Sequence, residues 1–224
     1  MSPWPQKDEL TTLREAARDL RYLLARGYRR RHAVTFVGDR FQFDNTLRHI
    51  LFRAVFPRAV AKERRKKRLK AGEIRGQRLV VDGYNCFITL ESGLKGETVI
   101  YCDDGFFRDV SGVFRRFRPS ELTETAWSLM ARVFKRYRPE FIQFLLDKPY
   151  SNSGRFCGQI RSWMVDAGLD GTCALFDRSE RDLCNHQGDI VASGDSVIID
   201  SCNRLFDLTG HILRHYLRAR SIKL

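Results

Sequence analysis

Three aspartates occupy the same place in three separate apolar stretches. Asp82 ends the stretch LVVD, Asp147 ends FLLD, and Asp195 ends IVASGD. Each stretch predicts a buried strand with a carboxylate just past its carboxyl end. Because the carboxyl ends of parallel strands meet at one edge of a sheet, we expect the three carboxylates to converge on a single crevice.

Such a cluster favours a bound divalent cation. Like charges gathered in one crevice raise one another's pKa unless a cation neutralises them. Oxygen ligands without a His or Cys partner select a hard ion, Mg²⁺ or Mn²⁺, over zinc. Asp82, Asp147 and Asp195 are therefore the expected metal ligands. Beside a basic surface, an ion of this kind supports hydrolysis of a phosphodiester bond.

Two further side chains are candidates for the same site. Asn85 follows Asp82 by three residues, and its amide can orient a carboxylate or a water molecule. Asp104 also follows an apolar stretch and is a candidate fourth acid, with Asp103 and Glu91 as alternatives. Asp103 can equally make a turn before a glycine.

These motifs resemble the acidic positions of the PIN-like nuclease superfamily, particularly its branch that opens with Asp-x-x-Asn. The resemblance rests on DGYN at 82–85, FLLD at 144–147 and ASGDS at 192–196, and it covers about residues 77–210. It implies a Rossmann-like sheet and metal-dependent ribonuclease activity carried by Asp82, Asn85, Asp147 and Asp195. The chain also resembles an uncharacterised prokaryotic family that joins a small basic helical domain to a PIN-like half.

The chain departs from the PIN-like pattern in one respect. That pattern usually places an acid on a helix between the first and middle aspartates, and here the candidate acids lie in less regular sequence. Asp195 also has a second interpretation, because the residues after it predict a helix that its side chain could cap.

Charge is distributed very unevenly along the 224 residues, whose formal net charge is +13. Residues 1–76 hold 20 of the 40 Lys and Arg but only 8 of the 27 Asp and Glu. A segregated basic segment attracts phosphate backbones through counterion release and long-range steering. An acidic membrane surface would be attracted too, but the expected partner is RNA, and no membrane is expected.

The candidate RNA-docking residues belong to two basic runs within this segment. A single charge run is more often a solvated helix end or linker, but neighbouring basic segments favour contact with nucleic acid. The residues are Arg29, Arg30, Arg31, Arg64, Arg65, Lys66, Lys67 and Arg68.

The elements that position these residues fall into two expected domains. Residues 1–76 predict a basic α-helical domain and linker, with helices over 8–26 and from an Asp44 cap to just before Pro57. Residues 77–224 predict a PIN-like α/β domain, so the expected fold class is α/β, a Rossmann-like and mainly parallel sheet preceded by a small helical domain. Expected strands are 79–81, 98–102, 141–146, 173–176 and 190–192; expected helices are 122–137 and 156–167.

The segment between residues 85 and 105 is less regular. Residues 88–101 predict a β-hairpin that turns between Gly93 and Gly96.

The first residues lack the apolar core of a signal peptide, and the longest apolar runs are too short to span a bilayer. We therefore expect a cytoplasmic protein. Its six cysteines include no Cys-x-x-Cys pair, which predicts reduced, mostly structural thiols.

Three functional classes fit these observations. The first is a Mg²⁺- or Mn²⁺-dependent endoribonuclease with a basic RNA-docking unit. The second is an RNA-binding protein on a PIN-like scaffold that does not cleave. The third is a small-molecule phosphohydrolase, although the usual Asp-x-Asp pattern is missing beside the first strand and the basic segment would have no role. A nucleotide-driven enzyme is disfavoured because the chain has no Gly-x-x-x-x-Gly-Lys-Ser/Thr loop.

Overall fold

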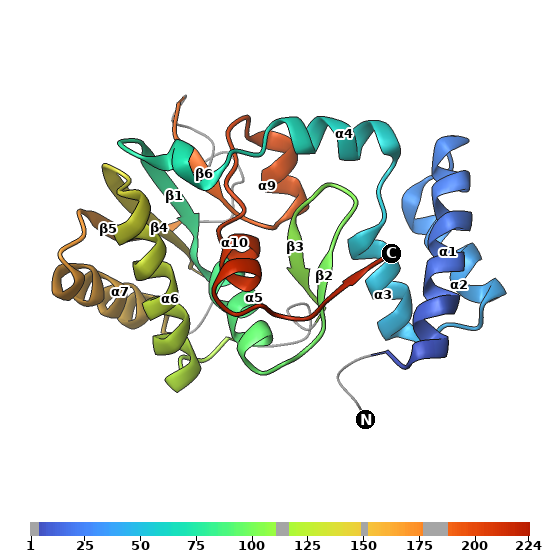
Figure 1. The fold of residues 1–224 in the computed structure, drawn as a ribbon, viewed down its shortest axis with the longest axis horizontal. Coiled ribbons are helices and arrows are strands. Elements are labelled where there is room, and N and C mark those ends of the chain that lie inside the picture. Colours follow the sequence, from blue (N-terminus) through green and yellow to red (C-terminus); the bar gives the residue numbers. More distant parts are fainter. Residues whose placement is uncertain (1–4, 111–116, 149–151, 177–187) are drawn as a thin grey trace.

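The structure is a computed structural model that describes residues 5–110, 117–148, 152–176 and 188–224. The described residues contain two sheets flanked by helices (Figure 1). The larger has four strands in the order β5-β4-β1-β6, and every neighbouring pair is parallel. Its strands are β1 (Arg78–Asp82), β4 (Phe141–Asp147), β5 (Gly171–Phe176) and β6 (Ile190–Ala192).

Alternate residues of the parallel sheet enter two different cores. Leu79 and Val81 of β1 pack into the main core, on the face covered by α5, α6 and α7. Val80 points to the other face, where it packs with Ile198 and Ile199 of α9. This period of two is the expected consequence of the pleat. The helices are α5 (Gly83–Leu94), α6 (Glu121–Tyr137), α7 (Ser153–Ala167) and α9 (Ser196–Ser201).

The expected mixed α/β fold with a mainly parallel sheet and an N-terminal helical region is thus confirmed. One strand was assigned to the wrong sheet. The expected strand at 98–102 forms as β2 (Val99–Tyr101), but it pairs with β3 (Phe107–Asp109) antiparallel and with β7 (Ser221–Lys223) parallel. The physical reason is that β2 has an apolar partner on each face: Val99 enters the main core, and Ile100 enters the core of the N-terminal helices.

The expected hairpin over 88–101 is wrong. Residues 83–94 form α5 instead, because Cys86, Phe87 and Leu90 lie on one helical face and are buried in the main core. Gly93 makes no turn; the Leu213 side chain of α10 (Leu208–His215) fills the space where a Cβ at Gly93 would lie. The chain turns after the helix, at Gly96, whose φ is +70°.

The N-terminal helices pack around their own core, which closes over Ile100 and Cys102. The two expected helices are confirmed, and Asp44 caps the second by accepting a hydrogen bond from the Leu47 amide at 2.8 Å. The two basic runs were not expected to form helices, yet most of their residues lie in α2 and α4. The four helices are α1 (Lys7–Ala25), α2 (Arg30–Arg40), α3 (Asn45–Ala54) and α4 (Arg58–Lys66).

The C-terminal strand joins the N-terminal helices to the smaller sheet. Figure 1 shows the C-terminus beside α1 and α3. Arg14 donates to the backbone oxygen of Lys223, and Arg21 donates to that of Leu224. The C-terminal strand is therefore packed against α1.

A buried ion-pair cluster fixes α4 against the rest of the molecule. Arg108 of β3 donates to both carboxylate oxygens of Asp104, at 2.8 and 2.7 Å. Arg64 of α4 donates to the same carboxylate at 2.9 Å and to both oxygens of Asp200 on α9 at 2.7 Å. Burial alone would raise the pKa of Asp104, but Arg108 and Arg64 hold it below its ordinary value.

Among the described residues, the expectation of reduced thiols is wrong for Cys157, Cys173 and Cys202. Cys157 of α7 and Cys173 of β5 form a disulfide with a Cα–Cα distance of 5.3 Å. Packing of α7 onto β5 brings the two cysteines together. Their spacing in the sequence matches no motif that would predict a disulfide. Cys86 and Cys102 are buried free thiols.

Removing the central charge of the ion-pair cluster should destabilise the fold. In Asp104→Asn, the fully buried Arg108 loses its paired carboxylate, so we expect the free energy of unfolding to fall by about 3–5 kcal/mol. Urea denaturation monitored by circular dichroism measures the change. The matched control is Asp39→Asn, whose carboxylate is 66% exposed in its pair with Arg48 and should cost less than about 1 kcal/mol. Equal effects of the two substitutions would contradict the assignment.

Candidate functional site

Asp82 and Asp195 flank the place where the order of the parallel strands reverses. From β1 the chain adds β4 and then β5 on one side, and it later adds β6 on the other side of β1. Asp82 is the last residue of β1, and Asp195 follows the end of β6 by three residues. In open parallel sheets the crevice for a ligand lies outside the carboxyl ends of the strands at such a reversal.

Backbone and side-chain hydrogen bonds connect these two aspartates. Ser193 Oγ donates to Asp82 Oδ2 at 2.7 Å and accepts from the Asp195 amide at 3.0 Å. The Gly194 amide donates to Asn85 Oδ1 at 2.8 Å. The Asn85 side chain therefore holds the turn that carries Asp195, whereas the sequence predicted that it would orient a carboxylate or a water molecule.

The turn after β6 needs a glycine at position 194. A Cβ on Gly194 would lie 3.1 Å from the Phe107 carbonyl oxygen and 3.2 Å from Asn85 Oδ1. Arg108 Nε donates to the Gly194 carbonyl at 2.7 Å. The buried ion-pair cluster therefore also fixes the backbone of the acidic crevice.

The three strand-end aspartates act on one another electrostatically. The pKa of Asp82 is raised to about 7, first by burial and then by the charges of Asp195 and Asp147, while the Ser193 hydrogen bond lowers it. Asp147 ends β4, the neighbour of β1, and lies two residues beyond the partner of Asp82 in the register. The charges of Asp147 and Asp195 therefore act on Asp82, and a metal site formed by the three acids stays a prediction.

Carboxylate oxygens suit a hard cation, but the side chains of the three strand-end aspartates do not surround a single point. Among the described residues, no three or more His, Cys, Asp or Glu side chains form a group that could hold a metal ion. Asp195 Oδ1 is occupied as the cap of α9, accepting from the amides of Val197 and Ile198. Asp195 therefore caps a helix, as its second interpretation predicted, and its role as a metal ligand stays a prediction.

The candidate fourth acids are engaged elsewhere. Asp104 is fully buried in the ion-pair cluster described above, so the structure does not place it at the crevice as the sequence predicted. Asp103 pairs with Arg21 through both oxygens, at 3.0 and 2.7 Å. Glu91 lies on α5, where it accepts from the Thr123 hydroxyl at 2.5 Å. Each of these acids is paired with a side chain that the sequence around it does not indicate.

The predicted RNA-docking residues divide into exposed and buried members. Arg64 is only 4% exposed and belongs to the ion-pair cluster, which is incompatible with the predicted contact. Arg30 is half-buried over the rings of Phe52 and Phe56, and burial followed by the charges of two arginines lowers its pKa to about 10. Lys67 and Arg68 are half-buried. The exposed members are Arg29, Arg31, Arg65 and Lys66.

Sequence reasoning missed Ser193, which hydrogen-bonds Asp82. The signal available was the serine in the turn ASGD, directly between the strand and the aspartate. A hydroxyl at that place can accept from one end of the turn and donate to the neighbouring strand.

None of the helices within the described residues combines the length and the apolar character needed to cross a bilayer.

Comparisons with known proteins place this mixed α/β chain with its acidic crevice in a family. Residues 71–211 match the model described as "Domain of unknown function (DUF5616)", and the chain belongs to this family. Residues 12–67 match "Protein of unknown function (DUF434)". The "Uncharacterized protein MJ0935" of Methanocaldococcus jannaschii is 29% identical over 192 residues, which cover 86% of this chain and 91% of that relative. No solved structure matches.

The raised pKa of Asp82 makes stability depend on pH. Because the folded pKa is about 7 and the ordinary value is 3.8, the folded protein holds a proton that the unfolded chain has lost, and stability falls as pH rises between these values. In Asp82→Asn this loss disappears. We expect the stability of the variant relative to the parent to increase from pH 4 to pH 8, by on the order of a few kcal/mol.

Urea denaturation at a series of pH values in EDTA measures this difference. Asp166→Asn, which changes an exposed carboxylate on α7, is the matched control and should show no such trend. A pH-independent difference between parent and Asp82→Asn would mean that Asp82 ionises as an ordinary carboxyl.

Proposed function

We propose that the crevice flanked by Asp82 and Asp195 is the active site of a Mg²⁺- or Mn²⁺-dependent endoribonuclease with a PIN-like fold. One observation carries the proposal: Asp82, Asp147 and Asp195 lie at or just past three strand ends of one parallel sheet, and the charges of Asp195 and Asp147 add to burial in raising the pKa of Asp82. Carboxylates that repel one another at a ligand site are stabilised when a bound cation neutralises their charge. The strand order supports a doubly wound sheet, because β4 and β5 lie on one side of β1 and β6 lies on the other.

Asp82, Asp147 and Asp195 would hold the ion, which supplies an activated water and charge stabilisation for the leaving oxygen of a phosphodiester. The chain's own residues prepare this site. Ser193 orients the Asp82 carboxylate, and Asn85 fixes the turn before Asp195. Since the carboxylates are not gathered around one point, metal binding has to draw them together, and relief of their repulsion favours this step.

The basic N-terminal region would dock the RNA. The exposed members of the two runs, Arg29, Arg31, Arg65 and Lys66, are the side chains available for phosphate contacts. Because these helices share a core with β2, their charges are held at fixed places relative to the parallel sheet. A polyanion can therefore be attracted by one part of the molecule and presented to another.

Substitution of Asp82 tests the catalytic part of the proposal. Asp82→Asn removes a metal-holding charge, so we expect cleavage of a labelled RNA in Mg²⁺ or Mn²⁺ to fall at least about a hundredfold, while RNA binding persists. Binding of Mn²⁺ alone, measured by calorimetry, should weaken in parallel. Gel analysis of parent and variant in Mg²⁺, Mn²⁺ and EDTA provides the cleavage measurement.

The control for this assay is Asp166→Asn, which makes the same change on an exposed surface and should leave cleavage unaltered. Cleavage that survives in EDTA, or that is equal in parent and Asp82→Asn, would overturn the metal-nuclease assignment. Binding of RNA without cleavage of any substrate would instead favour the second candidate.

Salt dependence tests the docking part. Deleting residues 1–76 would expose Ile100 and remove the Arg64 partner of Asp104, so charge neutralisation is the sounder experiment. If all four exposed basic side chains contact phosphates, changing them together to Gln should reduce the slope of log K against log salt by about 3.

Fluorescence anisotropy with a short single-stranded RNA at several salt concentrations gives this slope. Arg132→Gln combined with Lys135→Gln neutralises two exposed charges on α6 and should leave the slope nearly unchanged. A quadruple variant with the parental slope would show that the basic runs serve another purpose.

A second candidate, an RNA-binding protein that does not cleave, has its own support. The described residues contain no preformed group of metal ligands, and the candidate fourth acid Asp104 is engaged by two arginines. A small-molecule phosphohydrolase, the third alternative, leaves the basic N-terminal region without a role.

A further inference from the structure

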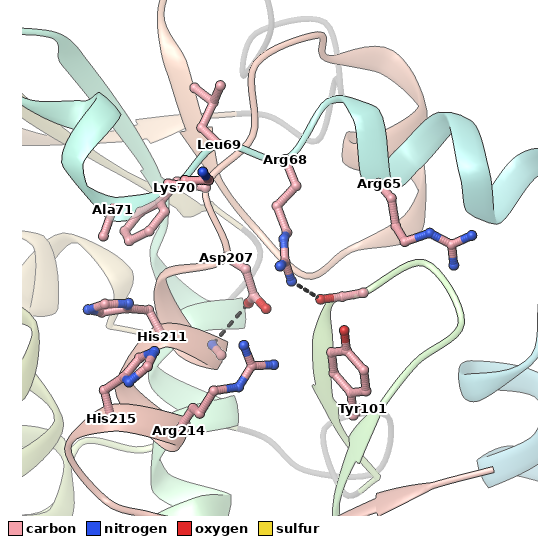
Figure 2. Close-up of a pocket in the computed structure, with 13 residues that line it drawn as sticks. Arg65, Arg68, Leu69, Lys70, Ala71, Tyr101, Asp207, His211, Arg214 and His215 are labelled. Carbon is pink, nitrogen blue, oxygen red and sulfur yellow. Dashed lines mark hydrogen bonds between the residues drawn. The ribbon is translucent and has the colours of Figure 1, made fainter.

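A pocket of about 410 Å³, which none of the three strand-end aspartates lines, opens between the end of α4 and the helix α10. Figure 2 shows its walls: the segment from Arg65 to Ala71 lies above, and α10 with Arg214 and His215 lies below. The short 3₁₀ helix η1 (Ala71–Ile74) follows the upper wall. Only two of the predicted RNA-docking residues, Arg65 and Arg68, take part in it.

The pocket concentrates positive charge that carboxylates do not balance. Arg65, Arg68, Lys70 and Arg214 line it, and none of them forms an ion pair with a carboxylate in the described parts of the chain. Asp207 is the one acid among the described lining residues. Like charges enclosed in a concave wall produce a positive potential that attracts an anion.

Hydrogen bonds from the backbone occupy the Asp207 carboxylate. Its two oxygens accept from the amides of Phe107, at 3.2 Å, and Gly210, at 2.9 Å. Asp207 is buried as the cap of α10, and burial raises its pKa. The Asp207 carboxylate is therefore engaged by backbone amides, and it offsets only part of the charge of the four basic side chains.

The two arginines on opposite walls are held in place. Arg68 donates to the Gly105 carbonyl, and Arg214 lies over the rings of Tyr101 and Phe107 at 5.3 and 5.1 Å. Figure 2 shows their guanidinium groups extending toward each other from above and below. Two guanidiniums presented to the same space repel each other unless an anion lies between them, and their planar donor sets match a phosphate.

His211 also lines the pocket and has a ring nitrogen without a hydrogen-bond partner among the described residues. The pKa of His211 is lowered to about 4, first by burial and then by His215 and two arginines, so the ring is neutral at pH 7. Within the described residues, His211 Nε2 is buried and has no hydrogen-bond partner. A neutral imidazole can donate one hydrogen bond to an anionic oxygen without adding to the positive charge.

We propose that this pocket is a phosphate-binding site, occupied either by a phosphate of an RNA backbone or by that of a small phosphorylated molecule. Arg68, Lys70 and Arg214 are its principal ligands. Its volume lies in the range of sites for small molecules. The proposal does not rest on hydrolysis at the acidic crevice.

The experiment uses the full chain in EDTA at low ionic strength. The probes are pyrophosphate, a nucleoside 5′-monophosphate and a single-stranded RNA with no terminal phosphate, each titrated by calorimetry. In the double variant Lys70→Gln/Arg214→Gln, we expect pyrophosphate affinity to fall by at least about tenfold, because charged hydrogen bonds are lost. Lys135→Gln on α6, exposed and outside the pocket, is the matched control and should bind like the parent.

The probes distinguish the two sources of phosphate. If the RNA backbone occupies the pocket, binding of the unphosphorylated RNA weakens with that of pyrophosphate. If a small molecule occupies it, only pyrophosphate and the monophosphate weaken. Arg68→Gln, which changes a different side chain of the pocket, guards against a folding defect in the double variant, and thermal melting of all variants accompanies the titrations.

Two results would overturn the proposal: no saturable binding of any probe to the parent, or losses in the pocket variants no larger than in the control. Asp82→Asn should retain the pyrophosphate affinity of the parent. A failure of the phosphate site is thus separable from a failure of the nuclease assignment, which the RNA cleavage assay decides.

Discussion

The bidentate pair between Arg108 and Asp104 is the interaction on which the arrangement of the molecule depends. Both side chains are buried, so neither charge could persist there without the other. Arg108 extends the pair to the Gly194 carbonyl in the turn of the acidic crevice. Arg64 extends it to α4 and, through Asp200, to α9. A single buried carboxylate thus fixes the backbone of the candidate site and the attachment of the basic helices.

The smaller sheet explains how a basic helical region and an acidic crevice can work as one body. Ile100 of β2 belongs to the core of the N-terminal helices, while Val99 beside it belongs to the core of the parallel sheet. The last strand, β7, pairs with β2 and is bound at its end by Arg14 and Arg21 of α1. The basic helices and the strand-end aspartates therefore lie in separate regions that are joined through the smaller sheet.

The sequence predicted those parts of the fold that local periodicity determines. The stretch at 79–81, the cap at Asp44 and the stretch at 190–192 carry short-range signals, and each element formed as expected. The helix α5 was missed because glycines bracket its end and its apolar residues also fit a strand. Which face such a segment buries is decided by α6 and α10, which lie far along the chain.

Which residues of a charge run become buried also cannot be predicted from the neighbouring sequence. Arg64 and Arg65 are adjacent and chemically identical, yet one is buried and the other exposed. The difference is set by Asp104 and Asp200, which are 40 and 136 residues away. The same distant pairing turned Asp104 from a candidate catalytic acid into a structural one. The strand-end positions of Asp82, Asp147 and Asp195 were predictable because the apolar strands before them are local signals that do not depend on a side-chain partner.

The raised pKa of Asp82 also constrains how a cation and an RNA strand could share the crevice. Near pH 7 the carboxyl exchanges between a neutral form, which repels a polyanion less, and an ionised form, which a cation prefers. A proton and a divalent ion therefore compete for the same oxygens. Once the ion is bound, its charge offsets the three aspartates, and the strand meets less repulsion. By linkage, an RNA already held by the basic surface would raise the affinity for the ion by the same factor. If the proposed function is right, the separation of basic and acidic regions would favour binding of both partners together over binding of either alone.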